Sequence, residues 1–162
     1  MTTTPDVIYR ELLAQAQTAV TATLDTSRVT IVPVPDFDDR TMTPKVMLVL
    51  PGNATVLHPE SGLGLVREEF QVCVLQKINR DQAGNLDIAL SSATNSIVVL
   101  VNTLRGDGAP GTSASGLLNF QTTNAIGLCR LVGWSRVQQS QVDRSYLMWT
   151  DRYRIEYEVD YY

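Results

Sequence analysis

The final fourteen residues of the chain, WTDRYRIEYEVDYY (149–162), constrain its fold more than any other stretch. Two series of side chains alternate there with a period of two. The apolar and aromatic series comprises Tyr153, Ile155, Tyr157, Val159 and Tyr161, and the charged series comprises Arg152, Arg154, Glu156, Glu158 and Asp160. Such alternation is typical of a β-strand with one buried and one solvent-exposed face. Because chain termini usually fray, a terminal strand this regular is expected to be held by a neighbouring element.

Other short segments also have the composition of strands. Residues 28–35 (RVTIVPVP) are rich in β-branched side chains, and their prolines predict an edge strand or one that ends early. Residues 45–50 (KVMLVL) are almost continuously apolar, which predicts a central strand covered on both faces. The stretch 128–138 (LCRLVGWSRVQ) predicts a further strand, and the closing strand is expected to begin near Tyr146.

The longest internal strand is predicted over residues 65–78, after a loop around His58. One side of its period-two pattern is apolar, with Val66, Phe70, Val72 and Val74. The other side is polar, with Arg67, Glu69 and Gln71. This strand is therefore also expected to bury one face.

Two segments have apolar residues at helical spacing. Thr4 and Pro5 predict a helix start, and the helix is expected over residues 6–24 through Ile8, Leu12, Ala16, Ala19 and Val20. Residues 86–104 predict a buried helix, with Gly106 as its C-terminal stop. Its apolar positions are Leu86, Leu90, Ala93, Ile97, Leu100, Val101 and Leu104.

The order of these elements predicts the fold class. One helix, three strands, a second helix, a long loop and two strands follow one another without regular β-α-β alternation. This order indicates an α+β fold, with a mixed or antiparallel sheet of about five strands and two main helices packed on it. We expect a single domain over residues 1–162, with a long, flexible, Gly/Ser-rich loop at 106–116 (GDGAPGTSASG).

Composition excludes several classes of function. The chain has a net charge of −4 and a pI near 4.9, which argues against a surface that binds DNA phosphates broadly. It has no apolar run of membrane-spanning length and no signal-peptide pattern, so synthesis in the cytosol without membrane association is expected. Cys73 and Cys129 belong to no CxxC pair, and we expect both to be reduced and buried.

No catalytic or cofactor motif stands in a suitable context. GDGAPG fits G-x-G-x-x-G at Gly106, Gly108 and Gly111, but it follows a helix instead of joining a strand to one. His58 is the single histidine, and without a G-x-S-x-G motif it is interpreted as a residue of a surface turn. One histidine and two separated cysteines also lack zinc-ligand spacing.

Acidic residues give no stronger signal. Asp36, Asp38 and Asp39 share a loop that could contact a cation, but the glycine and distant glutamate of an EF-hand are missing, so a solvated acidic loop is favoured. Glu68 and Glu69 are adjacent in a strand and point to opposite faces, which argues against a general acid–base pair. We expect no cofactor, no metal and no enzymatic activity.

The chain resembles the tail terminator and related neck proteins, which join head and tail in long-tailed bacteriophages. The resemblance covers most of the chain as element order, and it is most particular in PDVIYRELLAQAQTAV, VREEFQVCVLQKI and WTDRYRIEYEVDYY. It implies a small α+β subunit of a ring, usually a hexamer, that caps the tail tube where it meets the head. The loop GDGAPGTSASG and the strand KVMLVL have no counterpart in the family pattern, which leaves the exact neck component open.

The resemblance also implies partners and a location. The subunit would form a homo-oligomeric, hexameric ring in the virion tail or neck, after synthesis in the host cytoplasm. It would contact the tail tube protein and a head-completion or connector protein. Six copies at −4 each would carry about −24, so DNA would pass through the ring without sequence-specific binding.

Subunit contacts are expected at the long loop and at the edge of the closing strand. The expected interface residues are Gly108, Ser113, Ser115, Tyr161 and Tyr162. The residues alone leave two alternatives open, because fold class does not fix function. They are a small α+β domain that binds a ligand or a partner, and a small enzyme.

Overall fold

The computed structural model of the chain describes residues 4–21, 28–36, 44–50, 55–57, 63–78, 86–106, 116–120, 130–137 and 146–160. The elements in chain order are α1 (Pro5–Thr21), β1 (Val29–Val32), β2 (Lys45–Val49), β3 (Thr55–Leu57), β4 (Leu63–Lys77), α2 (Leu86–Arg105), the 3-10 helix η2 (Leu117–Asn119), β5 (Arg130–Val137) and β6 (Tyr146–Asp160). This is the predicted α+β fold.

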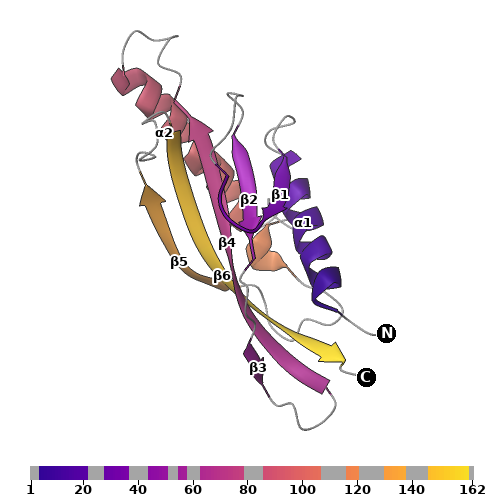
Figure 1. Cartoon of the computed structure of the whole chain (residues 1–162). Coiled ribbons are helices and arrows are strands. Elements are labelled where there is room, and N and C mark those ends of the chain that lie inside the picture. The colour runs from indigo at the N-terminus through magenta and orange to yellow at the C-terminus, as the bar shows by residue number, and fades with distance from the viewer. Residues whose placement is uncertain are drawn as a thin grey trace.

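The strands form one mixed sheet in the order β1-β2-β4-β6-β5 (Figure 1). β1 and β2 are parallel, and the remaining neighbours are antiparallel. β4 and β6 pair along their whole length, from Leu63 opposite Asp160 to Lys77 opposite Tyr146. The prediction that the closing strand is held by a neighbour is confirmed, because β6 lies between β4 and β5.

β3 is a strand that the sequence did not predict. It pairs antiparallel with β4, from Thr55 opposite Arg67 to Leu57 opposite Leu65. β2 pairs with the same edge of β4, but at residues 71–75. Three residues are too few to show a period-two pattern. His58, around which a loop was predicted, lies outside the described residues.

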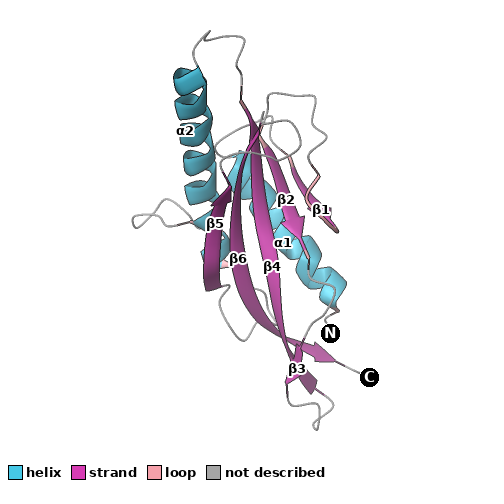
Figure 2. Ribbon diagram, turned by 60° about the vertical axis from the view of Figure 1, so that its left-hand side comes forward, coloured by secondary structure: helices cyan, strands magenta, loops and turns pink. Residues whose placement is uncertain are grey.

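Both helices pack on the same face of the sheet (Figure 2). The apolar side predicted for residues 65–78 faces them, and so do Tyr153, Ile155 and Tyr157 of β6. Phe70 and Tyr153 stack with their ring centroids 5.3 Å apart. The helices contribute to this core mainly through Ile8, Leu12, Ala16 and Val20 of α1 and Ala93, Ile97, Leu100, Val101 and Leu104 of α2.

The helix ends follow the sequence signals. The carbonyl of Thr4 accepts hydrogen bonds from the backbone N–H groups of Val7 and Ile8, with Pro5 as the first helical residue. α2 ends at Arg105, and Gly106 then adopts a φ of 75°, which residues with a Cβ rarely adopt. The N–H of Gly106 donates to the carbonyl of Asn102 at 3.0 Å. The predicted glycine stop is confirmed.

The strands near the edge also match their predictions. β1 ends at Val32, directly before Pro33, and it forms one edge of the sheet. β2 buries Val46, Met47 and Leu48 in succession, so it is covered on both faces as its apolar run predicted.

Candidate functional site

The residues predicted to contact other subunits, Gly108, Ser113, Ser115, Tyr161 and Tyr162, lie outside the described residues. Their role stays a prediction. The structure does describe the base of the long loop. Gly106 and Gly116 touch there, because a Cβ on Gly116 would lie 2.2 Å from the Cα of Gly106. The side-chain amide of Gln15 donates to the carbonyl of Gly116 at 2.6 Å, which fixes the loop base against α1.

Glu68 is a buried carboxylate on the helix-covered side of β4. Its side chain is 2% exposed and shares this side with Val66 and Phe70. The hydroxyl of Tyr9 in α1 donates to Oε1 at 2.5 Å, and that of Tyr157 in β6 donates to Oε2 at 2.9 Å. Glu69 points to the other face, as predicted.

This cluster links three elements, α1, β4 and β6. Burial, followed by the hydrogen bond to Glu68, raises the pKa of Tyr9 well above its ordinary value. Burial, followed by the negative charge of Glu68, raises the pKa of Tyr157 in the same direction. Both phenols therefore remain hydrogen-bond donors at neutral pH, and each carboxylate oxygen has a partner. The signal in the sequence was that Glu68 falls in the same period-two series as the apolar residues Val66 and Phe70, which predicts a buried position.

Asp151 is the second buried carboxylate, at the middle of β6 and 3% exposed. Arg105, the last residue of α2, donates to it from Nε at 2.5 Å and from Nη2 at 2.7 Å. The indole N–H of Trp149 donates to Oδ1 at 2.7 Å. Such paired donors to one carboxylate fix both distance and orientation. This group therefore ties the end of α2 to the sheet.

An exposed aromatic surface extends from this ion pair to the edge of the sheet. Trp134 of β5 stacks on Trp149, with ring centroids 5.1 Å apart and an interplanar angle of 12°. The guanidinium carbon of Arg105 lies 5.6 Å from the centroid of Trp149, a cation–π distance. Trp134 itself is 61% exposed. The sheet edge at β5 thus carries a large aromatic ring that stacks on Trp149 and is otherwise mostly exposed.

The sheet face opposite the helices, which we call the outer face, carries the polar series of β4 and β6. Arg67 pairs with Glu156 at 2.7 Å, and Arg154 pairs with Glu69 at 2.7 Å. Each pair joins two residues that are directly opposite each other across β4 and β6. These side chains are partly exposed, so the pairs order the surface more than they stabilise the fold.

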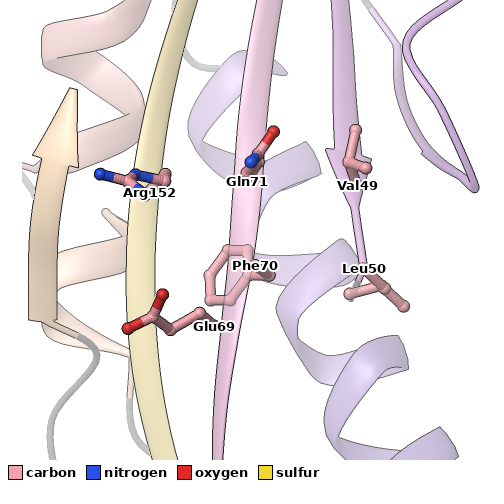
Figure 3. A pocket seen from close by; sticks show the side chains of 6 residues that line it. All are labelled: Val49, Leu50, Glu69, Phe70, Gln71 and Arg152. Carbon is pink, nitrogen blue, oxygen red and sulfur yellow. The ribbon is translucent and has the colours of Figure 1, made fainter. Parts of the chain in front are cut away.

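A groove of about 230 Å³ lies next to these pairs. Figure 3 shows its lining, with Arg152 extending from β6 toward β5. Arg152 can lie there because the residue opposite it on β5 is Gly133, where a Cβ would come within 3.3 Å of Nη2. The lining side chains are Val49, Leu50, Glu69, Phe70, Gln71 and Arg152.

The outer face is apolar and buried at the end where the last residues of β4 pair with the first residues of β6. Met47, Cys73, Leu75 and Tyr146 form a second, smaller core there. Cys73 is free, and burial raises the pKa of its thiol. Its sulfur lies 3.6 Å from the hydroxyl of Thr150. Cys73 is thus a buried small residue, as predicted, whereas Cys129 lies outside the described residues.

The remaining acidic and glycine motifs are described only in part. Asp36 forms an exposed ion pair with Lys45 at 2.9 Å, while Asp38 and Asp39 lie outside the described residues, as do Gly108 and Gly111 of the GDGAPG motif. Among the described side chains, no group of three or more His, Cys, Asp or Glu residues could hold a metal ion. No helix in the described part of the chain is long and apolar enough to cross a membrane.

Comparison with known proteins gives a likeness of fold. No protein-family model matches the chain, and no curated protein matches it. The structure is similar to a chain in the solved structure "Virion of native gene transfer agent (GTA) particle", with a TM-score of 0.51 and 12% sequence identity. The match covers 93% of this chain and 91% of that chain. The two chains therefore share one fold over nearly their whole lengths.

Proposed function

We propose that this protein is a structural subunit of a phage neck or tail, and that it acts as the tail terminator, which caps the tail tube and joins it to the head. The observation that carries the proposal is the fold match to a chain of a virion particle, over 93% of this chain. The element order and the three sequence stretches that resemble tail terminator and neck proteins support the same assignment. Its location would accordingly be the virion, after synthesis in the host cytoplasm.

A role in assembly without catalysis is part of the proposal. Glu68 and Asp151 are the buried carboxylates among the described side chains, and both are held by tyrosine, arginine or tryptophan donors. Carboxylates engaged in this way connect helices to strands. They therefore contribute to a rigid subunit, which suits a ring component.

The proposed assembly is a closed homo-oligomeric ring, a hexamer. A ring of this kind needs two different surfaces on each subunit that fit one another. Among the described strands, β1 and β5 form the two edges of the sheet, at opposite ends of the strand order. Ile31 on β1 and Trp134 on β5 are exposed apolar residues at these edges. The loop at 106–116 and the residues Tyr161 and Tyr162 are further proposed contacts.

The ring would bind the tail tube protein on one side and a head-completion or connector protein on the other. DNA would pass through its channel without sequence-specific binding. The net charge of −4 per chain supports this, since an acidic channel repels phosphates.

Native mass spectrometry of the full chain, with negative-stain electron microscopy, tests the proposal. A ring of six copies that co-sediments with purified tail tube protein is the expected result. A gel-shift assay with double-stranded DNA should show no specific complex. A chain that remains monomeric at all concentrations, and that does not bind tail tubes, would contradict the proposed function.

A further inference from the structure

Arg152 differs from Arg67 and Arg154, which also lie on the outer face, in having no carboxylate partner among the described residues. Arg67 is paired with Glu156, and Arg154 is paired with Glu69. Arg152 instead extends across Gly133 at the edge of the groove (Figure 3). An exposed guanidinium at the edge of a groove is suited to a carboxylate, which it can bind through two parallel hydrogen bonds.

The rest of the groove indicates the size and kind of its occupant. Val49 and Leu50 form its apolar side, and Gln71 lies between Val49 and Arg152 in the same cross-strand row. Its volume of about 230 Å³ is below the range of about 300–1,000 Å³ that is typical of small-molecule sites. The groove therefore fits one acidic side chain with a neighbouring aliphatic side chain better than it fits a metabolite.

A second copy of the chain can supply such a pair. The chain has 17 acidic residues against 13 basic ones, so its copies carry a surplus of carboxylates. Among the described acidic residues, Glu11 on α1 and Glu158 on β6 are exposed and form no ion pair within the described part of the chain. Val7, which is 39% exposed, precedes Glu11 by four residues and thus lies one helical turn away on the same side of α1.

Glu158 and Glu11 lie on different surfaces of the chain, so a contact of Arg152 with one or the other would give a different kind of assembly. Glu158 lies on the outer face together with Arg152, so a contact between them would join two copies face to face. Such a contact uses the same surface twice and gives a dimer. Glu11 lies on α1, which covers the opposite face of the sheet (Figure 2). A contact between Glu11 and Arg152 uses two different surfaces, as a closed ring requires.

We propose that the groove at Arg152 is a contact between subunits, in which Glu11 of a second copy binds Arg152 and Val7 of that copy packs on Val49 and Leu50. The inference rests on the proposed ring and adds the residues that close it. Charge complementarity carries it: among the described residues, Arg152 at the edge of the groove and the exposed Glu11 on another surface of the chain both lack an ion-pair partner.

Charge reversal tests the contact. R152E and E11R should each weaken assembly of the full chain by about tenfold or more, and the double variant R152E/E11R should restore it, because the ion pair is then re-formed in reverse. R28E is the matched control: Arg28 is exposed, does not line the groove, and its reversal changes the net charge as much as R152E does. Native mass spectrometry measures the oligomer, and circular dichroism verifies that each variant folds.

Every other outcome contradicts the proposed contact, and the outcomes differ in whether they also contradict the proposed ring. If the wild-type ring forms and R152E assembles equally well, the contact is wrong and the ring stands. If R152E weakens assembly but E11R does not restore it, Glu11 is not the occupant. If the wild type is a dimer and E158R restores assembly of R152E, the assembly is a face-to-face dimer and not a ring. If the wild type is a monomer, both the contact and the proposed function are wrong.

Discussion

Arg105 and Asp151 form a bidentate ion pair between the end of α2 and the middle of β6, with N–O distances of 2.5 and 2.7 Å. The two side chains are only 13% and 4% exposed. A buried pair contributes little relative to apolar residues of the same size, but loss of one partner leaves an uncompensated charge. The pair therefore restricts the position of α2 on the sheet, because any shift of the helix end would separate the charges.

The first prediction concerns this pair. Arg105→Ala should lower the free energy of unfolding by roughly 3–5 kcal/mol, because Asp151 would remain buried without its cation. Urea denaturation measures the change. Arg10→Ala is the control, since Arg10 pairs with Asp6 on the exposed side of α1 and should contribute less than about 1 kcal/mol. Equal losses in the two variants would show that burial of Asp151 is not the cause.

The second prediction concerns the tyrosines that bind Glu68. Tyr157→Phe keeps the ring in the core and removes one donor to a buried carboxylate, which should cost roughly 1.5–3 kcal/mol in urea denaturation. Tyr9→Phe should act in the same direction. The double variant should lose more than the sum of the two, because Glu68 would then have neither phenol as a partner. Strict additivity would indicate that the two hydrogen bonds are independent.

The third prediction follows from the raised pKa values of Tyr9 and Tyr157. In the unfolded chain these phenols lose their protons near pH 10, whereas in the folded chain they keep them to higher pH. The stability that they contribute is thus fully present below about pH 10 and is lost as the pH rises toward the folded pKa values. Unfolding measured from neutral to strongly alkaline pH should show a smaller alkaline loss for Tyr157→Phe than for the wild type. An equal loss would contradict the assignment.

The local elements could be predicted from sequence because long periodic segments carry their own signal. β6 begins at Tyr146 as expected, and α2 covers the predicted residues with its stop at Gly106. The pairing of these elements could not be predicted. That β6 inserts between β4 and β5 depends on contacts between segments far apart in the sequence, which a local pattern does not contain.

The buried polar clusters were missed for a related reason. Glu68 and Asp151 occupy positions that the period-two pattern assigns to the buried series, but a charged residue there is interpretable only with its partners. Those partners come from distant elements: Tyr9 is 59 residues from Glu68, and Arg105 is 46 residues from Asp151. The groove at Arg152 was also not visible in the sequence, because it depends on the register that places Gly133 opposite Arg152.

The fourth prediction tests the packing of α2. Leu100 is fully buried against the sheet, whereas its neighbour Val99 is 54% exposed. Leu100→Ala should cost roughly 2–5 kcal/mol, because it removes buried methyl groups and leaves a cavity. Val99→Ala should change stability by less than about 0.5 kcal/mol. If Val99→Ala lowered the stability of the oligomer strongly but left that of the monomer unchanged, the exposed side of α2 would instead lie in a subunit contact.

The last prediction concerns the closing strand and the two tyrosines that follow it. A chain that ends at Tyr153 should not fold, because it lacks Ile155 and Tyr157, which are 3% and 1% exposed, and with Tyr157 one donor to Glu68. A chain that ends at Asp160 keeps every residue of β6. It should therefore retain a folded monomer.

Tyr161 and Tyr162 lie outside the described residues, and their predicted role is to contact a neighbouring subunit. Truncation after Asp160 should consequently weaken the oligomer while the circular dichroism spectrum remains that of the folded chain, because aromatic side chains at a strand end supply contact area at low entropic cost. Size-exclusion chromatography over a range of concentrations separates the two effects. An oligomer that is unchanged by the shorter truncation would exclude the tyrosine pair from the interface, and a folded chain ending at Tyr153 would show that the second half of β6 is not essential to the core.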